Sequence, residues 1–109
     1  MKSQENNKKF WVKYAYVIRG KQRILAIKVL DKPMIVIELR KKINSTISNS
    51  RNQLSLREVS RQLKNFSEQG IAECLNPQEP LGRIYRLTKL GRKIREEILE
   101  ISENIDKNE

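Results

Sequence analysis

The segment that most constrains the fold is residues 54–87, where an arginine-rich helical pattern ends at a glycine and continues into two short strand-like runs. Ser55 and Glu58 have the spacing of a capping box, which predicts a helix starting at residue 56. Gln69 and Gly70 predict its end. Apolar residues at helical spacing give this helix one core-facing side: Leu56, Val59, Leu63 and Phe66.

The residues after Gly70 predict a β-hairpin. Residues 71–75 suit a strand better than a helix, and residues 83–87 resume β-prone alternation. Between them, residues 76–82 are rich in turn formers and include two prolines, which cannot donate to a strand ladder. We therefore expect a hairpin with a stiff tip, in which strand parity leaves open whether Arg86 points out or packs along the sheet.

The other side of the 56–69 helix carries Arg57, Arg61, Lys64 and Asn65. An isolated cationic stripe usually does no more than keep a helix soluble, but here the whole charge distribution is uneven. Residues 1–92 hold 20 basic and 7 acidic side chains, a net of +13, whereas residues 93–109 have a net of −3. A basic body with an acidic tail is typical of a protein that binds a polyanion, which implies DNA or RNA as partner.

Three helices are predicted before this segment. Asn7 could cap the first, whose broad apolar face includes Phe10, Trp11 and Tyr14. After a break at residues 19–20, residues 21–30 have the pattern of a largely buried helix. Residues 34–37 could form a short strand, but the spacing of three apolar residues favours a helix that ends in basic residues 40–42: Ile35, Leu39 and Ile43.

Residues 45–53 form a polar stretch, rich in serine and asparagine, between the third and fourth helices. A tolerated surface insertion explains this stretch most simply, because lengthening a loop costs little entropy. The alternative is a loop that contacts phosphate through Arg51 and neighbouring hydroxyl groups.

Thr88 can cap a last helix over residues 89–105. Its isoleucines are close to a heptad pattern, and about 24 Å of helix is long for so small a domain. Folding back onto the domain is one alternative, but pairing with a second copy is favoured. We expect a dimer interface built from both ends of the chain: Phe10, Trp11, Tyr14, Ile94, Ile98, Ile101 and Ile105.

The chain length predicts a single domain over residues 1–109, with a core at about 16–92 and a C-terminal dimerisation helix and tail at 93–109. A chain with one cysteine and no histidine offers neither a disulfide framework nor the usual metal or general-base chemistry, so we expect no metal, no cofactor and no enzyme activity. No apolar run has the length of a membrane span or resembles a signal peptide, so we expect a cytoplasmic protein. An effector could occupy a dimer cleft beside the N-terminal aromatic residues, but aromatic packing explains them more simply.

Four short sequence motifs occur in this order: YVIRGKQRI at 16–24, VSRQL at 59–63, EQGIAECLNP at 68–77, and GRIYRLT at 82–88 followed by Gly91. With them the chain resembles the small winged helix-turn-helix transcriptional regulators of the MarR/ArsR-like group, especially short archaeal-type members. The resemblance implies a mostly helical α+β fold with a recognition helix, a wing, and terminal helices that dimerise. The chain departs from the family pattern in two places. Residues 45–53 enlarge the turn before the recognition helix, and residues 34–37 lack the polar cap that is usual before the supporting helix.

The resemblance also implies a homodimer on double-stranded DNA, with helix 56–69 in the major groove and wing 71–87 on the backbone or minor groove. It places Ser55, Arg57, Ser60, Arg61 and Lys64 toward the groove and Arg83 at the wing tip. Arg51 in the polar loop and Arg86 on the second strand are further candidate contacts that the resemblance does not assign. Independently, arginine can bind guanine or phosphate, and serine can donate a hydrogen bond to either.

Two alternatives stay open. A winged helix can also serve as a protein-interaction or RNA-binding adaptor, although adaptors usually lack a basic recognition face. Cys74 could sense oxidants, but its neighbours Glu73 and Leu75 offer no positive charge that would activate a thiol, so a packing role is favoured.

Overall fold

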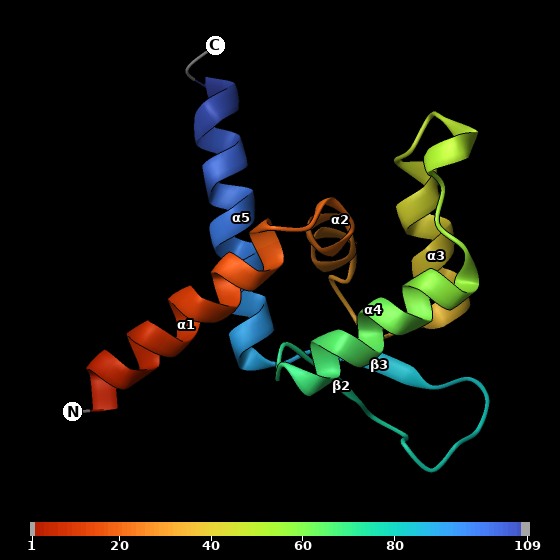
Figure 1. Cartoon of the computed structure of the whole chain (residues 1–109), viewed down its shortest axis with the longest axis horizontal. Helices are drawn as coiled ribbons and strands as arrows, with labels where there is room; N and C mark the ends of the chain where they lie inside the picture. The colour runs from red at the N-terminus through yellow and green to blue at the C-terminus, as the bar shows by residue number, and fades with distance from the viewer. Residues whose placement is uncertain (1, 108–109) are drawn as a thin grey trace.

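The computed structural model describes the backbone of residues 2–107 and the side chains of residues 7–103. This part of the chain is a mostly helical α+β unit with a three-stranded antiparallel sheet (Figure 1). In chain order the elements are α1 (Lys2–Ile18), α2 (Lys21–Val29), β1 (Met34–Ile35), α3 (Val36–Ser45), the 3-10 turn η1 (Ser50–Asn52), α4 (Leu56–Glu68), β2 (Ala72–Cys74), β3 (Ile84–Leu87) and α5 (Lys89–Lys107).

The sheet has the order β1-β3-β2. The predicted hairpin is confirmed, because β2 and β3 pair with Cys74 opposite Tyr85 and Ala72 opposite Leu87. β1 lies on the other side of β3, where Ile35 pairs with Ile84. The prediction that Ile35 lies on a helix is therefore wrong: the short strand takes residues 34–35, and α3 begins only at Val36, with no side-chain cap.

The predicted boundaries of α4 are confirmed. The backbone nitrogen of Glu58 donates to Ser55 Oγ at 3.1 Å, and Gly70 adopts a φ of +73° that favours glycine. Three of the four residues predicted to face the core are fully buried: Val59, Leu63 and Phe66. The fourth prediction is wrong, since Leu56 is 42% exposed. It lies on the first turn of the helix, beside an open groove.

The predicted cap of α5 is also confirmed, since the Gly91 nitrogen donates to Thr88 Oγ1 at 3.1 Å. The first turn of α5 packs closely on the backbone after α4, where an added Cβ on Gly91 would overlap the carbonyl oxygen of Ile71. Ile94 and Ile98 are only 0% and 6% exposed and belong to the core of the protomer. Their prediction as dimer contacts is wrong, because their methyl groups already pack inside their own chain.

α1 and α5 extend on the side of the molecule away from α3 and the tip of the hairpin (Figure 1). The radius of gyration is 14.5 Å, compared with about 13 Å for a compact domain of this size. α1 begins at Lys2, so Asn7 lies inside the helix and does not cap it. Among the described residues, no helix combines the length and the apolar content needed to cross a membrane.

Candidate nucleic-acid interface

The centre of the candidate interface is the solvent-facing side of α4. Arg57, Arg61 and Lys64 are all exposed on it, directly opposite the buried side of the same helix. Within residues 7–103, the ion pairs are Lys32 with Glu38 and Arg86 with Glu73. The three cations of α4 therefore have no carboxylate partner in this part of the chain, and their charges face solvent.

The hydroxyl groups of Ser55, which caps α4, and of Ser60, which lies within α4, have different surroundings. The Ser55 hydroxyl accepts a hydrogen bond from the Glu58 backbone and donates to Glu58 Oε1 at 3.1 Å, so its hydrogen is already used in the cap. Ser60 is exposed one turn further along the helix and lines the groove beside α4. Of the two hydroxyl groups, that of Ser60 is the better placed to contact a ligand.

The tip of the hairpin is held by hydrogen bonds between its own residues. The side chain of Asn76 donates to the Gly82 oxygen at 3.2 Å and accepts from the Ile84 nitrogen at 2.7 Å. Arg83 Nε donates to the Glu79 oxygen at 2.9 Å and its guanidinium stays exposed. The expected stiff tip thus rests on these bonds as well as on its prolines.

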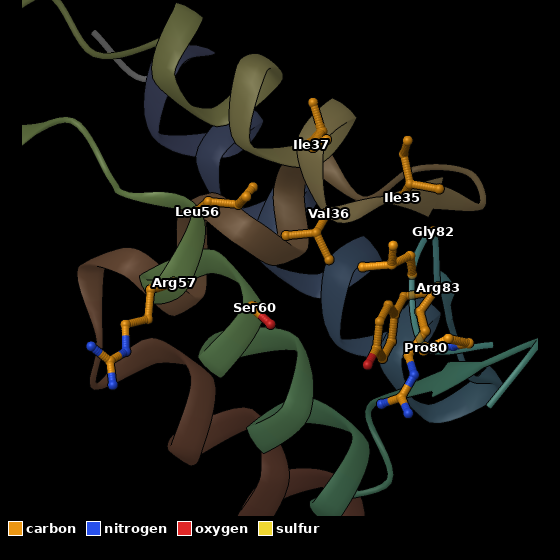
Figure 2. A pocket seen from close by; sticks show the side chains of 11 residues that line it. Ile35, Val36, Ile37, Leu56, Arg57, Ser60, Pro80, Gly82 and Arg83 are labelled. Atoms are coloured by element: carbon orange, nitrogen blue, oxygen red, sulfur yellow. The ribbon is translucent and has the colours of Figure 1, made fainter. Parts of the chain in front are cut away.

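A groove of about 690 Å³ lies between the start of α3, the first turns of α4 and the tip of the hairpin (Figure 2). Its wall includes Arg57 and Arg83 but is mostly apolar: Ile35, Val36, Ile37, Leu56, Ser60, Pro80, Leu81, Gly82 and Tyr85 complete the lining. Sequence reasoning missed this groove. Its signals were the apolar residues where a polar helix cap is usual and a leucine between Pro80 and Gly82 in a polar turn.

The structure does not bring Arg51 or Arg86 into this groove. Arg51 lies in η1 and lines a separate hollow with Lys21 at the start of α2. Arg86 points away from the core, which settles the question of strand parity, and its Nε lies 2.6 Å from Glu73 Oε1 across the hairpin. The guanidinium of Arg86 is thus already partnered by a carboxylate.

The predicted dimer contacts fall into distinct groups. Phe10 and Tyr14 are half-buried and stack with ring centroids 6.0 Å apart, while Trp11 packs edge-on against both and is 52% exposed. Ile101 on α5 is 39% exposed. Ile105 lies outside the residues whose side chains are described. Apolar surface that a partner could cover is therefore present at Trp11 and Ile101.

One hydrogen bond joins α1 to the end of α4. Lys13 Nζ donates to Gln69 Oε1 at 2.7 Å in a half-buried position. Gln69 is the C-cap residue of α4. The helix that carries the aromatic residues is thus directly connected to the helix that carries the cations.

Cys74 is half-buried in β2, and its Sγ donates to Asn76 Oδ1 at 3.6 Å. Among the described residues, no group of three or more His, Cys, Asp or Glu side chains is placed to hold a metal ion. No protein-family model, curated protein or solved structure significantly matches this chain. Function is therefore inferred from the geometry and charge of the surface itself.

Proposed function

We propose that this protein is a homodimeric, sequence-specific transcriptional regulator that binds double-stranded DNA through a winged helix-turn-helix. In this proposal α4 is the recognition helix in the major groove, and the β2–β3 hairpin is the wing on the backbone or minor groove. The observation that carries the proposal is the row of exposed, unpaired cations on α4, a helix whose other side is anchored in the core.

The order of the elements supports this proposal. α3 and α4 are consecutive packed helices, and a hairpin directly follows the second one. The hairpin tip and the first turns of α4 line the same groove (Figure 2), so one nucleic-acid molecule could contact both. Arg57, Arg61 and Lys64 supply contacts to phosphate or guanine, and Arg83 adds a cation from the hairpin.

The proposed dimer forms through α1 and α5. Trp11 and Ile101 expose apolar side chains on these two helices. Both helices extend away from α3 and the tip of the hairpin (Figure 1). A two-fold axis there would leave both copies of α4 free. Two recognition helices so related bind half-sites about one turn of DNA apart.

Salt dependence of binding tests the proposal. Each phosphate contact releases condensed counterions, so about six contacts per dimer would lower the affinity for duplex DNA roughly 10³-fold between 50 and 200 mM salt. Filter binding with mixed-sequence duplex measures this slope. An affinity that stays nearly constant over this range would reject the proposed DNA interface.

A protein-interaction adaptor is the second candidate, and the apolar lining of the groove is the observation that favours it. Apolar surface of this kind often marks a protein contact. Because a protein contact depends much less on counterion release than a DNA contact does, the same salt titration separates the two candidates.

A further inference from the structure

In the groove beside α4, exposed apolar side chains lie next to cationic side chains. Leu56 is 42% exposed, Ile37 is 52% exposed and Leu81 is 85% exposed, although all three lie next to the cationic surface. A surface that bound only phosphate groups would gain nothing from aliphatic side chains at these positions. The groove therefore suits a ligand that presents apolar groups together with negative charge.

The charge of the lining restricts that ligand further. Of the residues that line the groove, Arg57 and Arg83 are charged and no carboxylate is present. The groove is thus complementary to an anion that carries apolar groups. Duplex DNA meets this requirement, because its major groove exposes one apolar substituent, the 5-methyl group of thymine, between two phosphate backbones.

The position of Leu56 selects it as the residue that meets this methyl group. Leu56 is the first residue of α4, and the N-terminal residues of a recognition helix are those that reach base edges. Leu56 and Ser60 extend toward the groove from adjacent turns, whereas the guanidinium end of Arg57 points away from them at the edge of the lining (Figure 2). An apolar contact and a hydroxyl group thus lie side by side on one edge of the helix.

We infer that Leu56 is a specificity-determining residue that contacts a thymine 5-methyl group, so that each half-site contains a required T at that position. This inference rests on the proposed DNA-binding function. It adds the recognition of a particular base to the attraction between cationic side chains and phosphate. Ser60 lies one turn further on and hydrogen-bonds the neighbouring base or phosphate. Arg57, on the other edge of α4, contacts guanine or phosphate.

Deoxyuridine tests the inference, because it differs from thymidine only by the missing methyl group. A tight duplex is first selected from random DNA, and each T in it is then replaced singly by dU. The full chain should lose affinity at one T per half-site, by about fourfold for one methyl-sized group removed from contact. Leu56→Ala should bind the T duplex more weakly and show a T to dU affinity ratio near 1 at that position.

Leu75→Ala provides the matched control, because Leu75 is a leucine as exposed as Leu56, at 42%, that does not line the groove. This variant should keep the T to dU ratio of the parent protein. Circular dichroism checks the fold of each variant, and Leu56→Ser replaces Leu56→Ala if that chain does not fold. The comparison of T with dU in the parent protein needs no variant at all.

The outcomes separate the inference from the function on which it rests. If binding falls steeply with salt but no dU substitution changes it, the thymine contact is overturned and DNA binding stands. If Leu56→Ala keeps the full T to dU ratio, another residue contacts the methyl group and the assignment to Leu56 is overturned. If duplex binding is absent or insensitive to salt, the proposed function fails, and the thymine contact fails with it.

Discussion

Asn44 holds the main chain of Leu54 through both ends of its side-chain amide. Its Nδ2 donates to the Leu54 oxygen at 2.9 Å, and its Oδ1 accepts from the Leu54 nitrogen at 2.8 Å. Arg40 Nε adds a third hydrogen bond to the same oxygen at 3.2 Å. The end of α3 is thus joined to the residue just before the cap of α4. The long polar loop between them therefore does not set the position of α4.

Replacing Asn44 by alanine should destabilise the protein by about 2–3 kcal/mol, because the half-buried polar groups of Leu54 lose two hydrogen bonds. Urea unfolding of the variant and its parent measures this difference. Ser48→Ala, an exposed change within the same loop, is the control and should stay within about 0.5 kcal/mol. Equal stability of the Asn44 variant and the parent would show that the clamp does not stabilise the fold.

Gly91→Ala should destabilise the protein by about 1–3 kcal/mol, since the added methyl group overlaps the carbonyl oxygen of Ile71 and must push α5 outward. Intrinsic helix propensity alone predicts the opposite sign. Thermal unfolding decides between the two. Gly20→Ala is the control, because its added methyl group meets only the flexible side chain of Arg23. A Gly91 variant that unfolds at or above the melting temperature of the parent contradicts the predicted overlap.

Arg61→Ala should reduce both the affinity for DNA and the discrimination between sequences, because Arg61 lies on the proposed recognition helix. Arg83→Ala should weaken binding to all sequences alike and make the salt slope shallower, as expected for a phosphate contact. Competition titrations with selected and random duplexes measure both effects. Lys93→Ala on α5 removes the same charge away from the groove and serves as the control. Identical binding by the two arginine variants and the parent would reject their assignments.

Trp11→Ala should weaken self-association, because it removes the largest exposed apolar side chain of α1. Sedimentation equilibrium at several protein concentrations measures the dimer dissociation constant, which should rise by about tenfold or more, the effect of a buried aromatic anchor. Leu81→Ser changes an apolar residue at the hairpin tip that is even more exposed than Trp11 and should leave that constant unaltered. A monomeric parent protein at all concentrations tested would contradict the proposed dimer.

The sequence predicts α4 well because three independent signals agree there. The capping box, the apolar spacing and Gly70 each mark a different part of the same helix, and the structure contains all three features. The hairpin is equally readable, since its turn formers separate two short β-prone runs. Local chemistry decides these elements, so local patterns are sufficient to find them.

The remaining errors concern what lies opposite a given side chain. Periodicity predicts on which side of α4 the Leu56 side chain lies. It does not predict how far the neighbouring elements extend, and beside the groove they leave Leu56 partly exposed to solvent. The same limit applies to Ile94 and Ile98, because a heptad-like stripe has one pattern whether it faces its own core or a partner. The pairing of Arg86 with Glu73 depends on the register of the two strands, which a count of charged residues does not predict.

The central claim is that the exposed cations of α4 and the adjacent hairpin tip are the surface that meets duplex DNA. Titrating the ¹⁵N-labelled protein with a selected duplex and following each backbone amide by NMR tests it most directly. We predict the largest chemical-shift changes at residues 55–64 and 81–83, with little change along α1 and α5. Changes centred on α5 or on the hollow beside Arg86 and Arg92, with α4 unaffected, would contradict it.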